Sequence, residues 1–241
     1  MKLARILFAF TVTCLSASAL KAESLNIGTY DHLKSLDQIF RLKDFASEAL
    51  KKENFDVTFH STPVLRSAEL VQKGTLDGIF PCSSDIPKIF PDVILIEPPI
   101  LYTHLIAVSL KEDKAFSVAN LEKMRGTSIL NNLGVQDFAQ KRNLKILEVA
   151  QPQQAFELLE KKRVEFILLS QDVALAFLEL HPNLKDKIQL NPEILVEAAQ
   201  YFAISKKKSH LAPKIKKALK QALHENLKKY PHLKDIANKN F

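Results

Sequence analysis

Residues 69–84, ELVQKGTLDGIFPCSS, hold the pattern that decides the fold. They predict the end of a helix, a turn at Gly74 and then a short buried strand. Glycine often ends a helix because it adopts the left-handed backbone conformation without a Cβ penalty. The apolar run after the turn is typical of a buried strand. That strand ends in three small polar residues, Cys82, Ser83 and Ser84.

The chain repeats this pattern 88 positions later. Residues 157–172 read ELLEKKRVEFILLSQD, and without a gap Glu69 meets Glu157 and Ile79 meets Ile167. Two copies of a helix–turn–strand unit predict two similar α/β lobes. In open α/β sheets a ligand binds beyond the carboxyl ends of the strands. The candidate ligand contacts are therefore Cys82, Ser83 and Ser84 after the first strand and Ser170, Gln171 and Asp172 after the second.

The N-terminus has the features of a secretory signal peptide. Lys2 and Arg5 form a basic start, and residues 6–15 are apolar but too few to span a bilayer comfortably. Cleavage is predicted after Ala19 or Ala22, which makes residues 1–22 a signal peptide and predicts a periplasmic protein. The alternative is an uncleaved membrane anchor.

Composition agrees with a folded, exported protein. The chain has 241 residues, of which 46% are hydrophobic, enough for one large domain or two small ones with a real core. Loss of the signal peptide removes Cys14 and leaves Cys82 as a single thiol, so no internal disulfide is predicted. The net charge of +7 is compatible with nucleic-acid binding, but export argues against it, and a solvated basic helix face is the preferred interpretation.

Strands and helices alternate along the rest of the chain. Apolar spacing predicts helices at residues 33–52, 66–73, 119–124, 135–142, 153–162, 173–180 and 211–229. Further strands are predicted at residues 25–30, 56–61, 93–96, 101–110, 127–130, 144–149 and 198–205. The pair Pro98-Pro99 is expected to end the strand at 93–96. This alternation indicates α/β sheets.

The order of these parts resembles the type II periplasmic solute-binding proteins of bacterial ABC transporters, over nearly the whole mature chain. The segment QKGTLDGIF at residues 72–80 is similar to a sequence motif that is common in the family's first lobe. The resemblance implies a two-lobed α/β fold, each lobe a mixed sheet flanked by helices. The implied boundaries are residues 23–104 for lobe 1, 105–198 for lobe 2 and 199–241 for the return to lobe 1. Residues 101–108 and 198–204 would be the two hinge strands.

The chain departs from the family where amino acids are usually bound. Amino-acid-binding members carry a Thr/Ser-x-x-Arg element after the lobe 1 strand, and its arginine holds the ligand carboxylate. Residues 82–88 here read CSSDIPK, with no arginine. The aromatic-rich loop after the first strand is shortened to Tyr30-Asp31-His32. The resemblance therefore does not name the ligand.

Further candidate contacts come from strand ends and helix starts. Tyr30 is expected to stack on a ligand and Asp31 to accept from a cation, unless both belong to a surface turn. Arg66 can offer a bidentate fork to an anion or form a surface ion pair. Tyr102 lies at the first crossing between lobes. For Cys82 and Ser84 the alternatives are a small buried hydrophobe and a turn cap.

In lobe 2 a strand–turn–helix offers backbone amides to an anion. Its residues are Asn131, Asn132, Gly134 and Val135. The alternative is an ordinary turn. Asp77 and Glu165, which lead the two repeated strands, are predicted to be structural.

The resemblance implies a binding protein that closes around a small polar solute, amino-acid-like or an organic anion. It would act as a monomer and deliver the solute to an inner-membrane ABC permease, without a cofactor, metal or nucleic acid. No catalytic residues are predicted, since the sequence has no metal-binding spacing, nucleophile elbow or phosphate loop. Two alternatives stay open: an enzyme on the same fold, similar to cyclohexadienyl dehydratases, and a ligand-sensing partner of a membrane receptor.

Overall fold

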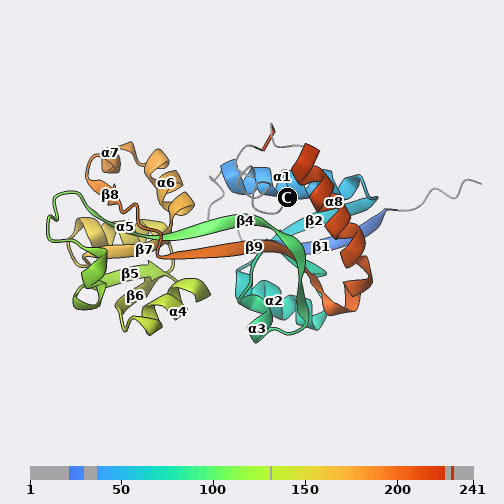
Figure 1. The fold of residues 1–241 in the computed structure, drawn as a ribbon, viewed down its shortest axis with the longest axis horizontal. Coiled ribbons are helices and arrows are strands. Elements are labelled where there is room, and N and C mark those ends of the chain that lie inside the picture. Colours follow the sequence, from blue (N-terminus) through green and yellow to red (C-terminus); the bar gives the residue numbers. More distant parts are fainter. Residues whose placement is uncertain (1–21, 30–36, 131, 226–228, 231–241) are drawn as a thin grey trace, which may run out of the picture.

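Two α/β lobes lie side by side and are joined by two long strands, β4 (Val93–Leu110) and β9 (Val196–Ser205), in the computed structural model of the chain (Figure 1). The structure describes residues 22–29, 37–130, 132–225 and 229–230. Both crossing strands fall where the sequence predicts hinge strands.

Lobe 1 is built from the two ends of the chain. Its elements are β1 (Glu23–Thr29), α1 (Asp37–Lys51), β2 (Phe55–Ser61), α2 (Val64–Lys73), β3 (Gly78–Ser83), α3 (Ile86–Ile89), a 3-10 segment η2 (Lys206–Leu211) and α8 (Ala212–Glu225). Apolar clusters cover both faces of its sheet. One cluster includes Phe45 of α1 and Leu219 of α8, and the other includes Val71 of α2 and Ile86 of α3.

Lobe 2 is one continuous stretch of chain. Its elements are η1 (Val118–Lys123), β5 (Arg125–Ile129), α4 (Leu133–Lys141), β6 (Lys145–Val149), α5 (Pro152–Glu160), β7 (Phe166–Ser170), α6 (Gln171–Leu180), α7 (Pro182–Lys185) and β8 (Ile188–Leu190). Its core also has two parts. Phe156 and Phe177 stack with ring centroids 4.1 Å apart on one face, and Phe166 and Leu168 lie in the cluster on the other.

Within the described ranges the strands form one nine-stranded sheet in the order β2-β1-β3-β9-β4-β7-β5-β6, with β8 on β4. β1 is parallel to β2 and β3, and β5 is parallel to β6 and β7, whereas β9 runs antiparallel to both its neighbours. β4 pairs with β7 from Leu105 onward and with β9 on the lobe 1 side. The lobe boundaries at residues 104/105 and 198/199 stay a prediction.

The repeat predicted from the sequence is confirmed in atomic detail. Gly74 after α2 has φ 78°, and Lys162, 88 positions later, has φ 53°. The amide of Thr75 donates to the carbonyl of Leu70 at 2.9 Å. In the second copy the amide of Arg163 donates to the carbonyl of Leu158 at the same 2.9 Å. The second copy thus makes a left-handed turn with a lysine where the first uses glycine.

The acidic residues that lead the two strands are structural, as predicted. Asp77 accepts a hydrogen bond from the amide of Asn26 at 2.8 Å, and Glu165 accepts one from the amide of Arg125 at 2.9 Å. Each carboxylate thereby fixes the start of its strand to the neighbouring parallel strand.

One expectation about the strands is wrong, and three short elements were not predicted. Pro98-Pro99 does not end a strand, because β4 continues through it. The pairing of β4 with β9 shifts register between Ile96 and Leu101, so the prolines lie where no ladder amide is needed. The short α3, α7 and β8 were not predicted, because three or four residues carry no periodicity.

Ion pairs of both polarities join the C-terminal helix α8 to the two residues that follow α1. Lys52 pairs with Glu225 at 2.5 Å, and Lys217 pairs with Glu53 at 2.7 Å. Across the part of the chain that the structure describes, no helix is both long and apolar enough to cross a membrane.

Candidate functional site

The lobe 2 side of the site is set by two helices that start at neighbouring strand ends. β5 and β7 are adjacent and parallel, so α4 and α6 begin at the same edge of the sheet. At the start of α4, Asn132 Oδ1 accepts from the amide of Val135 at 3.2 Å. The amides of Leu133 and Gly134 have no acceptor inside the helix by their position in the first turn. They are the groups that an anion could use.

The structure divides the predicted α4 residues into those that are accessible and those that are not. Val135 is 2% exposed and its amide is taken by the Asn132 cap, so it offers nothing to a ligand. Gly134 has open space, since a Cβ there would meet only Asn132 Oδ1 at 3.7 Å. Asn131 lies outside the described residues.

The start of α6 brings a half-buried carboxylate close to the crossing strands. Ser170 pairs with Leu105 of β4 in the sheet, and Gln171 and Asp172 form the first turn of α6. Burial raises the pKa of the Asp172 carboxyl, and the nearby His104 partly offsets this. A buried carboxylate of this kind is stabilised by a cationic partner, because a positive charge compensates for lost hydration.

The crossing strands carry a further side-chain pair, a histidine and a glutamate, next to Asp172. His104 of β4 and Glu197 of β9 are directly opposite in the antiparallel register, and His104 Nε2 lies 3.0 Å from Glu197 Oε2. The sequence analysis did not identify this pair. Knowing the strand register would have identified the pair, since cross-strand neighbours interact.

On the lobe 1 side, a buried hydroxyl and a polar turn follow the strands. Thr29 ends β1 with 1% exposure, and its Oγ1 has no hydrogen-bond partner within the described ranges. Ser83 ends β3, and its Oγ accepts from the amide of Asp85 at 3.2 Å and donates to its carboxylate at 3.3 Å. Ser84 is exposed in the same turn. Ser83 is therefore engaged by its own turn.

Cys82 occupies the core and not the surface of the site. Its side chain is fully buried among the apolar residues that hold α2 and α3 on the sheet, and burial raises the pKa of its thiol to about 12. Of the two interpretations of this residue, the small buried hydrophobe describes its position.

The remaining candidates are dispersed. Arg66 lies on the surface of α2, where its guanidinium donates to Glu69 at 2.7 Å and is half exposed, which matches the surface ion-pair alternative. Tyr102 is half-buried on β4 and packs against the core beside α1 and α8. Tyr30 and Asp31 lie outside the described residues.

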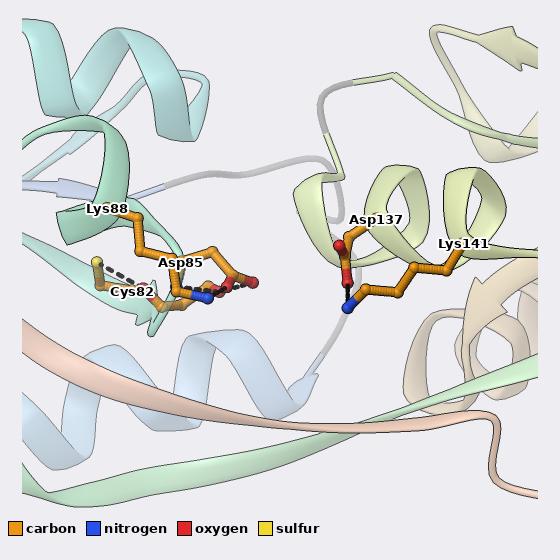
Figure 2. A network of polar contacts seen from close by, with 6 residues as sticks. Cys82, Asp85, Lys88, Asp137 and Lys141 are labelled. Carbon is orange, nitrogen blue, oxygen red and sulfur yellow. Dashed lines mark hydrogen bonds and ion pairs between the residues drawn. The ribbon is translucent and has the colours of Figure 1, made fainter.

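Two ion pairs that the sequence analysis missed face each other between the lobes (Figure 2). Lys88 of α3 pairs with Asp85 at 2.7 Å, and Lys141 of α4 pairs with Asp137 at 2.6 Å. The spacing of four residues could have identified the Asp137–Lys141 pair, because a helix is predicted at residues 135–142. The Asp85–Lys88 pair depends on α3, which was not predicted. No sequence pattern places the two pairs opposite one another.

Among the residues that the structure describes, no group of three or more His, Cys, Asp or Glu side chains is arranged to hold a metal ion.

Comparisons with known proteins give structural matches and no sequence matches. No protein-family model matches the chain, and a search of curated proteins finds no match. Among solved structures, an ancestral arginine-binding protein bound to arginine has a TM-score of 0.67 at 22% identity, with 90% of this chain and 98% of that chain covered.

Two further structures show the same likeness. The substrate-binding protein of an ABC uptake transporter from Streptococcus pneumoniae, with bound histidine, has a TM-score of 0.69 at 17% identity, covering 90% of this chain and 92% of that chain. The GluR0 ligand-binding core from Nostoc punctiforme, in complex with glutamate, has a TM-score of 0.65 at 15% identity, covering 90% and 99%. All three are binding proteins or binding cores. The chain has the two-lobed fold of the type II periplasmic binding proteins.

Proposed function

We propose that the protein binds a small, polar, amino-acid-like solute between its two lobes and delivers it to an inner-membrane ABC permease. The observation that carries the proposal is the position of two helix starts, α4 and α6, at adjacent strand ends beside the crossing strands. The three structural neighbours hold bound arginine, histidine and glutamate, respectively. A periplasmic location, a monomeric state and a predicted signal peptide complete the proposal.

The charges at the two helix starts favour a solute that carries both signs. The first-turn amides of α4 suit an anionic group, because a helix N-terminus carries partial positive charge. Asp172 at the start of α6 suits a cationic group. Burial disfavours the ionised form of its carboxyl, and a bound cation would compensate for the lost hydration. A zwitterion with a carboxylate towards Gly134 and an ammonium towards Asp172 would use both.

The residues proposed to line the site on the lobe 2 side are Asn132, Gly134, Ser170, Gln171 and Asp172. Asn131 is also proposed to line the site in lobe 2. The residues proposed to line the site on the lobe 1 side are Ser83, Ser84, Tyr102, Tyr30 and Asp31. Arg66 would have to leave Glu69 before it could bind an anion. Solute binding between lobes would shift the protein towards a closed form, because a ligand that touches both lobes has higher affinity for that form.

A thermal-melting panel of amino acids, polyamines, organic acids, sugars and phosphates tests the proposal. A solute at about 100 times its dissociation constant should stabilise the protein by roughly 2.7 kcal/mol, a shift of a few degrees. Asp172→Asn should abolish stabilisation by a cationic or zwitterionic solute, whereas Glu179→Gln, an exposed carboxylate on the same helix, should leave it intact. Equal loss in both variants, or a panel without a hit, would count against the proposal.

The same samples separate binding from catalysis. Incubation with prephenate and arogenate should leave both compounds unchanged if the protein only binds. Turnover of either would replace the transport proposal with an enzymatic one. Co-purification with a permease, and not with a receptor, would distinguish delivery from sensing.

A further inference from the structure

The two lobes touch through the start of α4. Leu133, the first residue of this lobe 2 helix, packs against the lobe 1 cluster that contains Ile86 of α3 and Val93 of β4. α4 thus contacts a core that belongs to the other lobe. This contact does not depend on the covalent crossings at β4 and β9.

Charges of opposite sign surround this contact. Asp85 and Lys88 lie on the lobe 1 side and Asp137 and Lys141 on the lobe 2 side, each pair closed within its own lobe and facing the other pair (Figure 2). The pKa of Lys88 is raised first by its hydrogen bond and charge interaction with Asp85, and further by the negative charge of Asp137. Lys88 therefore already experiences the electrostatic field of the opposite lobe.

Neither lobe needs the cross-lobe attraction in order to fold. The two pairs are local, at spacings of three and four residues, and the side chains of Lys88 and Lys141 are 74% and 72% exposed. Exposed pairs of this kind contribute little to stability, so a lysine can change partner at small cost. A contact between Lys88 and Asp137 would change the arrangement of the lobes and leave the fold of each intact.

We propose that Lys88 and Asp137, arranged around Leu133, form a latch between the lobes that stabilises the closed form. The proposal rests on the proposed function in one respect: the solute is what brings the lobes together. The latch then adds to closure without touching the solute, and it sets how long the closed form persists.

A double-mutant cycle with a distance readout tests the latch. Fluorophores on cysteines introduced at the exposed Lys73 of α2 and Lys145 of β6 report the separation of the lobes, in a protein carrying Cys14→Ser. Cys82 stays unlabelled because it is buried and its pKa is raised to about 12. The ratio of closed to open molecules is measured with and without a solute from the panel.

Lys88→Gln and Asp137→Asn should each lower the closed-to-open ratio roughly 2- to 5-fold, the range expected for an exposed ion pair. The double variant should be no worse than either single variant, because both remove the same interaction. Lys162→Gln is the matched control: its pair with Glu112 is equally exposed but lies outside the contact between the lobes, so the ratio should not change. About 1 M salt should remove the difference between wild type and the charge variants.

Additive effects of the two substitutions, or a ratio that neither changes, would overturn the latch. Leu133→Ala provides a second test, because it should reduce closure at low and high salt alike. Calorimetric titration of the same samples separates the two proposals. A protein that binds no solute but opens when Lys88 is neutralised retains the latch and loses the proposed function. A protein that binds solute but shows no coupling retains the function and loses the latch.

Discussion

Asn132→Asp is expected to separate the fold of α4 from its role in binding. Aspartate caps a helix about as well as asparagine, so the hydrogen bond to the amide of Val135, now 3.2 Å, should be kept. A negative charge at a helix N-terminus adds about 0.3–1 kcal/mol of stability. The variant should therefore melt at the same temperature as wild type or slightly higher.

Solute affinity should move in the opposite direction. An anionic group held by the amides of Leu133 and Gly134 would lie roughly 5 Å from the new carboxylate, because all three groups belong to one helical turn. Coulomb repulsion at that distance is about 1 to 3 kcal/mol for an effective dielectric constant between 80 and 20. The dissociation constant should therefore rise roughly 5- to 150-fold.

Asn132→Ser is the matched control, since serine also caps the helix but adds no charge. Both variants are compared with wild type by calorimetric titration with the solute that gives the largest melting shift. Binding that is equally tight in the aspartate and serine variants, with both folded, would refute an anionic group at the start of α4.

Other substitutions test the packing and the charges described above. Lys162→Gly should stabilise the protein by about 0.5–1 kcal/mol relative to Lys162→Ala, because φ 53° strains any residue with a Cβ; urea unfolding measures it. Gly78→Ala should destabilise by about 1–3 kcal/mol, since its Cβ would lie 2.2 Å from the carbonyl oxygen of Ala203; a melting temperature that does not fall would contradict the packing. Cys82 should react with a thiol reagent only when the protein unfolds, because its side chain is buried. Fast labelling of the native protein would contradict this buried position. Asp172 has a folded pKa above its usual value of 3.8, so wild type should lose stability as pH rises from there through the folded pKa; Asp172→Asn should be more stable at pH 7 and equal at pH 3, by urea unfolding at both.

The fold could be predicted from the sequence because its signals are local and repeated. Gly74, the apolar strand after it and the second copy 88 residues later specify two similar units, and the structure contains both. The crossing strands were also predictable, since an apolar run such as residues 101–110 is too long for a single small lobe. Periodicity failed at Pro98-Pro99, where a change of register in the pairing accommodates residues that normally end a strand.

The sequence could indicate which residues lie at strand ends, but not the direction of their side chains. Ile79 and Cys82 are three residues apart and should point to opposite faces of a regular strand. A register shift between them puts both in the same core, and that shift depends on the partner strand β9. The direction of the Cys82 side chain was therefore not available from the sequence.

Contacts between the lobes are harder to predict from the sequence than the residues at strand ends. Lys88 and Asp137 are 49 positions apart and belong to helices that are predicted separately or not at all. Their approach depends on how two folded lobes are oriented, which no local propensity specifies. Asp172 could be proposed from the sequence because it follows a repeated strand, whereas the nearby pair of His104 and Glu197 needed the register of β4 with β9.

The strand order has a consequence for how the protein is made. β9 lies between β3 and β4, in the middle of the lobe 1 sheet, yet among the described residues it is the last strand in chain order. The described strands of lobe 2, from β5 to β8, are complete by Leu190, before the chain reaches β9. During synthesis or export, lobe 2 can thus assemble while lobe 1 still has a gap at its centre. A chain that stops before residue 196 would leave both β3 and β4 with an unpaired edge, the surface through which incomplete sheets aggregate.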